Sequence, residues 1–262
     1  MKEVFITPPN SHLELTEKGT NNFYCLGQIY IKNPKYREYA LQAKKDGRFI
    51  ILDSGVGDHG TPIGNKELVE IAKELVPDEV IPLDTLYNSF PTMHSVVEMA
   101  GRLWDAGLSK DVKILGCPQG SSLDDWMSCY MFMLESDLVS TIGLSKKTIP
   151  YILFKAKEDD KIPESRHIIY DILKYHDLIK KPIHLLGSAG PWEYEYYKGD
   201  DMIRSTDSCI CVWSAMAGES FKDKDKYNRV PTPPDYFERE ISGEVMEKAE
   251  ENIRDFYKIA TV

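Results

Sequence analysis

The stretch VKILGCPQG at residues 112–120 contains the pattern from which the rest of the chain is built. Its first part, Val112–Leu115, is a short apolar run, and its second part is a turn rich in glycine, proline and polar residues. A helical pattern follows at Leu123–Leu134, after two serines and with two aspartates in its first turn. A short buried strand followed by a helix is the unit of a parallel sheet. The stretch therefore predicts one β-α unit, with Gln119 just past the carboxyl end of its strand.

The same unit recurs along the whole chain. The other predicted strands are Val4–Thr7, Phe23–Ile31, Phe49–Leu52, Glu79–Leu83, Ser140–Leu144, Pro182–Leu186 and Met202–Thr206. The other predicted helices are Lys35–Lys45, Lys66–Leu75, Met93–Ala106, Glu164–Tyr175, Pro191–Tyr197 and Glu244–Ile259. About eight such units predict an α/β fold of the (β/α)8 TIM-like barrel type. An open doubly wound sheet is disfavoured, because the sequence lacks the Gly-x-Gly-x-x-Gly turn typical of nucleotide-binding sheets.

The barrel is expected to occupy residues 1–262 as a single domain, because no composition shift marks a boundary. One stretch interrupts the rhythm. Gly218–Gly243 is polar, proline-rich and longer than an ordinary connection. Such stretches usually have a function or carry a lid, so we predict a long loop at 218–243 that could close over a site.

Charge and composition narrow the classes of partner. A net charge of −10 argues against a protein that holds nucleic acid mainly by a general positive coat. The basic segments at residues 44–48, 146–147 and 180–181 have two interpretations, a local basic channel or plain surface charge. Five cysteines without disulfide spacing, no signal-peptide pattern and no apolar run of about 18 residues predict a protein without membrane contact. We expect it in the cytoplasm, which is the host cytoplasm if the chain is viral.

Polar residues follow the predicted strands at the points where they end. Each one alone could be a turn, a helix cap or a surface side chain. Barrel enzymes place their catalytic groups at the carboxyl ends of the strands, so the set as a whole indicates one site. The stretches concerned are Asp53-Ser54-Gly55, Asp84, Gly116-Cys117-Pro118-Gln119-Gly120, Gly143-Leu144-Ser145-Lys146, Gly187-Ser188-Ala189-Gly190-Pro191 and Asp207-Ser208-Cys209.

In their order and spacing these motifs resemble those of the tRNA-guanine transglycosylase superfamily. The resemblance covers residues 49–211, from the Asp53-Ser54-Gly55 turn to the region of Asp207. It implies that Asp207 is the nucleophile, and that Asp53 recognises the base or handles its proton. It also implies that Asp84 binds the guanine edge and that the Gln119 amide faces the exocyclic oxygen. The other positions expected to bind substrate are Ser54, Gly120, Gly143, Leu144, Lys146, Gly187 and Arg204.

Two of those positions are basic and have more than one interpretation. Lys146 could reach the backbone of a polymeric substrate. Arg204 could contact a phosphate or pair with a carboxylate. His184, inside a predicted strand, is expected to be a core residue with satisfied ring nitrogens. Tyr194 and its neighbouring tyrosines could stack on bases or pack a helix against the barrel.

The chemistry that the resemblance implies suits these side chains. When a purine leaves, positive charge develops on the sugar, and a carboxylate on the opposite face can bond to the anomeric carbon. An incoming 7-deazaguanine such as preQ0 or preQ1 then displaces the covalent glycosyl-aspartate. No cofactor is needed, and the target nucleotide has to leave its stack. A carboxylate such as Asp84 can accept from the N–H groups of guanine, while Gln119 donates to its oxygen.

The chain departs from the usual family pattern. Only Cys209 and Cys211 stand near the position of the family's structural zinc site, and no Cys or His follows them, so we predict no zinc. The short chain resembles the compact bacteriophage-type relatives that insert 7-deazaguanines into DNA, which makes DNA the preferred polymer and tRNA the alternative. A barrel nucleoside or glycosyl hydrolase, or a non-catalytic nucleic-acid- or partner-binding subunit, also stays open. A homodimer is compatible with the sequence.

Overall fold

The computed structural model describes residues 2–8, 22–56, 61–156, 163–188, 190–224, 232–233 and 235–260. Its strands form a single sheet in the order β1-β8-β7-β6-β5-β4-β3-β2, and every neighbouring pair is parallel. The strands are β1 (Lys2–Phe5), β2 (Asn22–Leu26), β3 (Phe49–Asp53), β4 (Glu79–Val80), β5 (Lys113–Gly116), β6 (Val139–Ser145), β7 (Ile183–Leu186) and β8 (Ile203–Ser208). The end strands β1 and β2 contact each other, so the sheet curls into a nearly closed barrel.

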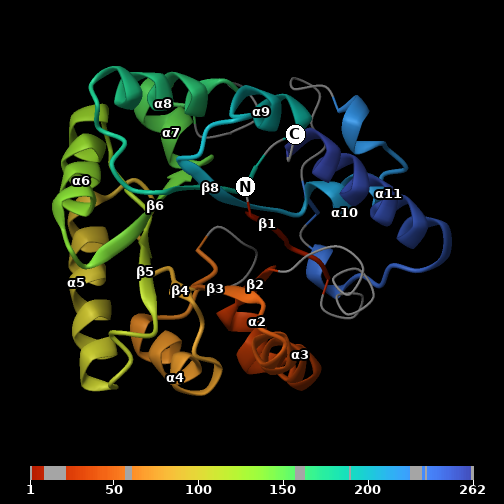
Figure 1. Cartoon of the computed structure of the whole chain (residues 1–262), viewed down its shortest axis with the longest axis horizontal. Coiled ribbons are helices and arrows are strands. Elements are labelled where there is room, and N and C mark those ends of the chain that lie inside the picture. The colour runs from red at the N-terminus through yellow and green to blue at the C-terminus, as the bar shows by residue number, and fades with distance from the viewer. Residues whose placement is uncertain are drawn as a thin grey trace.

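The helices surround this sheet on all sides in Figure 1. They are α2 (Gly27–Lys32), α3 (Pro34–Lys45), α4 (Asn65–Leu75), α5 (Ser89–Asp105), α6 (Leu123–Glu135), α7 (Thr148–Phe154), α8 (Ser165–Tyr175), α9 (Pro191–Tyr196), α10 (Ile210–Met216) and α11 (Gly243–Ala260). Local signals start several of them. The Asn33 side chain accepts from the Tyr36 amide at 3.2 Å before α3, and the Ser122 hydroxyl accepts from the Asp125 amide at 3.2 Å before α6.

Two apolar clusters hold the barrel together. One lies between the sheet and the helices α3 to α8, and it includes Ile50, Ile142 and Ile203. The other joins residues from alternate strand positions, such as Tyr24 and Ile51, to α10 and α11. Alternation along each strand produces this division, because successive side chains point to opposite faces. Strand register therefore decides which function-bearing side chains face the barrel interior.

The structure confirms the α/β class and the single parallel sheet, and it corrects several details. The predicted strand Phe23–Ile31 is too long, because residues 27–32 form α2. An apolar run alone does not separate a strand from a short helix, and here the helix starts at Gly27. Helix α5 begins four residues earlier than predicted, with Pro91 accommodated in its first turn. Helices α7 and α10 were not predicted, because each has only 7 residues.

The stretch predicted as the loop 218–243 is partly structured. It contains two short 3-10 turns, Phe221–Asp223 and Tyr236–Glu238. The Tyr236 hydroxyl donates to the Ile6 carbonyl at 2.6 Å, and the Phe221 amide donates to Asn252 Oδ1 at 2.8 Å. Residues 225–231 and 234 of this stretch lie outside the described residues. The described part of the loop is thus tied to the barrel and to α11.

In the part of the chain that the structure describes, none of the helices combines the length and the apolar character needed to cross a membrane.

Candidate active site

The first part of the site lies at the carboxyl end of β3. Asp53 is the last residue of the strand and is buried, and its Oδ2 accepts from the Gly55 amide at 3.1 Å. The Ser54 side chain is fully buried, and its hydroxyl has no hydrogen-bond partner among the described residues. Gln28, at the start of α2, is buried, its Oε1 likewise lacks a partner within the described ranges, and its amide group packs against Gly55. Unpartnered buried polar atoms of this kind are one feature of ligand sites.

Asp84 and Gln119, the pair that we predicted to bind the base, form the second part. The buried Gln119 donates through Nε2 to the Asp84 carboxylate, and its Oε1 accepts from the Thr148 hydroxyl and from the Tyr87 amide at 3.3 Å. Its amide orientation is therefore fixed, with the NH2 group toward Asp84. Burial raises the pKa of the Asp84 carboxyl group to about 6, although the hydrogen bond from Gln119 works in the opposite direction.

A buried cysteine links these two parts. Burial raises the pKa of the Cys117 thiol, and the negative charges of Asp84 and Asp53 raise it further. Gln119 Nε2, which donates to the Asp84 carboxylate, also lies 3.5 Å from Cys117 Sγ. Cys117, just after β5, and Asp84, after β4, are therefore joined through the Gln119 amide.

A β-bulge decides where Asp207 points. Ile183 of β7 pairs with Ile203 of β8, but the next residue, His184, pairs with Ser205, so β8 has one extra residue at Arg204. Ile203 belongs to the cluster between sheet and helices. In a regular strand Asp207, four residues later, would face the same side as Ile203. The extra residue reverses the alternation and turns Asp207 to the face that His184 occupies.

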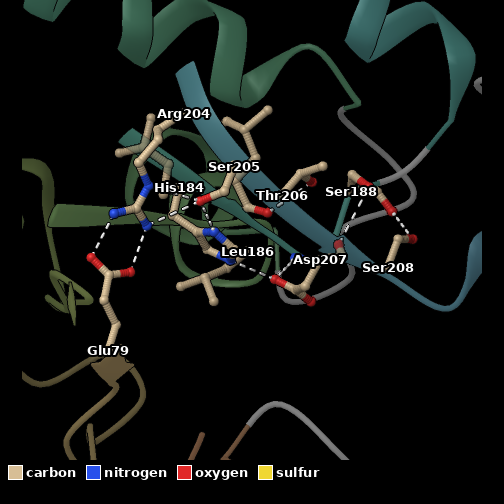
Figure 2. Close-up of polar contacts among 12 residues, drawn as sticks. Glu79, His184, Leu186, Ser188, Arg204, Ser205, Thr206, Asp207 and Ser208 are labelled. Carbon is tan, nitrogen blue, oxygen red and sulfur yellow. Dashed lines mark hydrogen bonds and ion pairs between the residues drawn. The ribbon is translucent and has the colours of Figure 1, made fainter. Parts of the chain in front are cut away.

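The carboxylate of Asp207 is buried and firmly held. Its Oδ1 lies 2.9 Å from His184 Nε2 and accepts from the Gly187 amide at 3.1 Å. Gly187 has φ +67, a left-handed conformation that favours glycine, and a β-carbon there would meet the Lys146 side chain. Figure 2 shows Asp207 at one end of a polar chain that continues through His184 and Ser205 to Arg204 and Glu79. Gly187, expected to bind substrate, thus holds the carboxylate itself.

A buried ion pair supports the ends of β6 and β7. Arg166 of α8 pairs with Glu193 of α9 at 2.5 Å, and both side chains are almost fully buried. The Arg166 guanidinium also donates to the carbonyls of Leu144 at 3.1 Å and of Leu186 at 2.7 Å. The backbone at Leu144, which we expected to touch the base, is therefore fixed in place from behind.

Two glycines that were predicted to bind substrate have packing reasons to be glycine. A β-carbon on Gly120 would lie 2.4 Å from the Trp126 amide nitrogen, so glycine allows α6 to approach. A β-carbon on Gly143 would lie 2.7 Å from a methyl group of Leu186. Gly143 lies inside β6 and Gly120 follows β5, and the need for glycine at both positions follows from packing.

The structure does not bring Arg204 to the carboxyl-end pocket. Its guanidinium forms a two-pronged ion pair with Glu79, the first residue of β4, with both contacts at 2.5 Å. It also donates to Thr141 at 2.8 Å. We therefore withdraw Arg204 as a substrate-binding residue and keep the other sequence-based interpretation, which is pairing with a carboxylate.

The basic runs divide between the two ends of the barrel. Lys146 and Lys147 follow β6 at the carboxyl end. Residues 44–48 precede β3 at the opposite end, where Lys44 pairs with Asp78 at 3.4 Å. Lys181, just before β7, donates to three backbone carbonyls at 2.6 to 2.9 Å. Of these three runs, the one at 146–147 lies at the carboxyl end, where the acidic site was predicted.

The two cysteines near the expected zinc position have separate surroundings. Cys209 Sγ lies 3.3 Å from Thr232 Oγ1, whereas buried Cys211 Sγ lies 3.6 Å from the Asn252 carbonyl. Within the described ranges, no group of three or more His, Cys, Asp or Glu side chains is arranged to hold a metal ion.

Sequence reasoning missed three residues of this region. His184 was interpreted as a satisfied core histidine, which its two ring contacts confirm, but its partner Asp207 was not foreseen. Gln28 follows β2, a position that the strand-end rule covers, but the predicted strand ran past it. Arg166 gave no signal, because a buried arginine in a helix looks like a surface residue in the sequence. Tyr194 and Tyr197 are buried and pack α9, which favours packing over base stacking.

No protein-family model matches this chain, and a search of the curated proteins gives no match.

Proposed function

We propose that this protein is a guanine transglycosylase that exchanges guanine in a nucleic acid for a 7-deazaguanine, through a covalent glycosyl-Asp207 intermediate. The observation that carries the proposal is the placement of three acidic residues in one nearly closed parallel barrel: Asp53 and Asp207 at the carboxyl ends of β3 and β8, and Asp84 in the segment that follows β4. The proposal includes closure of the sheet between β1 and β2 as a TIM-like barrel. Carboxylates at this end match what barrel enzymes use for catalysis.

The Asp84–Gln119 pair supports recognition of a guanine edge. An ionised Asp84 accepts from the amide N–H and the amino group of the base, while the Gln119 NH2 group donates to the neighbouring carbonyl oxygen. Thr148 and Tyr87 hold the Gln119 oxygen, so the NH2 group, which donates to Asp84 in the structure, is the part of the amide that we propose to engage a bound base. The Ser54 hydroxyl is fully buried in this structure, so its proposed contact with the base or its sugar requires neighbouring side chains to move.

The chemical step uses Asp207 and Asp53. A carboxylate oxygen of Asp207 bonds to the anomeric carbon as the bond to the base nitrogen breaks, and the bond electrons leave with the base. Asp53 supplies the proton that the departing base takes up. The incoming base returns a proton to Asp53 and displaces Asp207, so the sugar keeps its configuration after two displacements.

We propose DNA as the preferred polymer, on the resemblance to the compact bacteriophage-type relatives. The placement of Lys146 and Lys147 at the pocket end supports contact with a phosphate backbone there. Asp207→Asn is the matched inactive control, because it keeps the shape of the side chain but removes the nucleophile.

The test is incubation of the protein with labelled guanine or preQ0 and either duplex DNA or tRNA. Incorporation into DNA that Asp207→Asn abolishes supports the proposal, and incorporation into tRNA alone keeps the chemistry but corrects the polymer. Release of free base without incorporation would identify a hydrolase. No incorporation and no release with either polymer would overturn the proposal.

A further inference from the structure

His184 is a fully buried histidine to which the chemistry above assigns no role. Its ring stacks on Tyr24 with centroids 6.3 Å apart and planes 10° from parallel. Its Nδ1 lies 2.7 Å from Ser205 Oγ, and its Nε2 lies 2.9 Å from Asp207 Oδ1. The ring cannot turn without losing both polar contacts, so it is held in one orientation.

The polar chain behind His184 fixes which nitrogen carries the proton. Arg204 can only donate hydrogen bonds, and it donates to Ser205 Oγ from Nη2 at 3.1 Å and from Nε at 3.4 Å. The single hydrogen of the Ser205 hydroxyl then has one acceptor among the described residues, which is His184 Nδ1. The ring proton therefore lies on Nε2, from which it is donated to Asp207. Glu79 anchors Arg204 at the far end of the chain.

The two carboxylate oxygens of Asp207 are left in different states. Oδ1 receives two hydrogen bonds, from His184 Nε2 and from the Gly187 amide. Oδ2 receives none from the described residues, and it is not among the buried polar atoms that protein seals off without a partner. One oxygen is thus held by the protein, and the other is available to a ligand.

We propose that His184 is a positioning residue that, with the Gly187 amide, holds Asp207 Oδ1 and selects Oδ2 as the oxygen that attacks the anomeric carbon. This inference rests on the transglycosylase function proposed above. The two donors fix the rotation of the carboxylate, so that a lone pair of Oδ2 faces the sugar. Such fixed orientation lowers the entropy that the reaction must lose at its transition state.

The same two donors serve the second displacement. After attack, Oδ2 is the ester oxygen bonded to the sugar, and Oδ1 is the ester carbonyl oxygen. When the incoming base bonds to the anomeric carbon, the electrons of the breaking C–Oδ2 bond return to the carboxylate. The negative charge then spreads onto Oδ1, where His184 Nε2–H and the Gly187 N–H stabilise it. Both groups keep their protons throughout, so the step needs no further acid or base at Asp207.

The tautomer can be measured without any activity assay. Two-bond proton–nitrogen correlation spectra of protein labelled with 15N-histidine, assigned by comparison with His184→Gln, should show His184 protonated on Nε2 and bare on Nδ1. A proton on Nδ1 would overturn the inference, even if the protein proves to be a transglycosylase. The measurement is equally valid if the protein has another activity.

The kinetic test compares His184→Phe, which preserves the ring, with His184→Gln, whose amide nitrogen can still donate to Oδ1. We expect His184→Phe to slow formation of the covalent polymer–protein adduct by about 100-fold, because one donor to the reacting carboxylate is lost. KM for the polymer should stay within about twofold, since His184 binds no substrate. His184→Gln should recover activity to within about tenfold of the original protein.

A second buried histidine offers the matched control. His167 stacks on Tyr196 with centroids 3.7 Å apart and makes no contact with Asp207, so His167→Phe should leave adduct formation unchanged. Equal adduct rates in His184→Phe and the original protein would overturn the inference. The inference would also be overturned if His184→Phe changed only KM. The same holds if His184→Gln, while folded, failed to recover adduct formation. If the unaltered protein forms no adduct and exchanges no base, the proposed function fails instead.

Discussion

The polar groups at the two ends of the barrel differ in whether they have partners. At the amino end, charges have partners, since Glu79 pairs with Arg204 at 2.5 Å and Lys181 donates to three carbonyls. At the carboxyl end, the Ser54 hydroxyl and Gln28 Oε1 are buried without partners, and burial raises the pKa of Asp84 to about 6.

The contrast separates charged groups that stabilise the fold from polar groups at the proposed site. A buried polar atom without a partner costs free energy. Among the described residues such atoms also occur in the helices, at Tyr170 of α8 and Ser214 of α10, so only those near Asp53 are proposed to meet a ligand. Around Glu79, the described residues include no such atom, so we expect this end to serve stability, as is usual in parallel barrels. Substitutions at the carboxyl end should therefore change function more than stability, and substitutions at the amino end should do the reverse.

Asp207→Asn should have the largest effect. We expect base exchange and adduct formation to fall by at least about 10³-fold, because the nucleophile is lost while the amide keeps the size of the side chain. The melting temperature should shift by only a few degrees. Measurement of labelled-base incorporation and of thermal unfolding in the same preparation checks both expectations. Residual activity above about one-tenth of the original would refute Asp207 as nucleophile.

Glu79→Gln should mainly affect stability. Removing one partner of a largely buried ion pair leaves Arg204 without its countercharge, and we expect the free energy of unfolding to fall by about 3 kcal/mol. Urea denaturation measures this change. Lys73→Ala is the control, because Lys73 pairs with Glu70 on the exposed surface and should change the free energy by less than about 1 kcal/mol. Equal effects of the two variants would contradict the role given to the amino end.

The third prediction concerns pH and Asp84. Its carboxyl group must be ionised to accept from the base, so the affinity for a 7-deazaguanine should rise as pH increases through about 6. Asp84→Asn should weaken binding by about 10- to 100-fold and remove this pH dependence. Titration calorimetry between pH 5 and pH 8 measures both, with about 6 as the expected midpoint.

Stability should depend on the same group with the opposite sign. The pKa of Asp84 is higher in the folded protein than in the unfolded chain, so the folded state binds the proton more tightly. This contribution to stability is present below the ordinary pKa of an aspartate and is lost as pH rises through about 6. The stability of Asp84→Asn should not show that loss as pH rises. If the free energy of unfolding of Asp84→Asn exceeded that of the original protein by more and more as pH falls, the result would contradict the assignment.

Ser54→Ala should have the smallest effect. Removing an unsatisfied buried hydroxyl should leave the free energy of unfolding unchanged or raise it by up to about 1 kcal/mol, whereas base affinity should fall by up to about tenfold. Ser214→Ala is a matched control, since the Ser214 hydroxyl of α10 is also buried without a partner. Ser214→Ala should not alter base binding. If both variants weaken binding equally, Ser54 has no direct contact with the base.

Local pattern was enough to locate most elements. The strand at residues 112–115 and the helix at 123–134 are found within one residue of the predicted bounds, because buried apolar runs and capping residues act over short distances. Asp53 and Asp207 were predicted at strand ends for the same reason. Failures occurred where the apolar signal is ambiguous, as in residues 27–31, or where a helix is too short to show a period.

By itself, the sequence determined the alternation of strands and helices, the parallel sheet and the chain order of the carboxylates, since each follows from neighbouring residues. Tertiary structure decided which way those carboxylates face and what holds them. The extra residue at Arg204 becomes a bulge only when β8 pairs with β7, and that bulge turns Asp207 toward His184. Glu79 meets Arg204 across 125 positions of sequence. Such pairings depend on how the strands close around each other, and no local pattern carries that information.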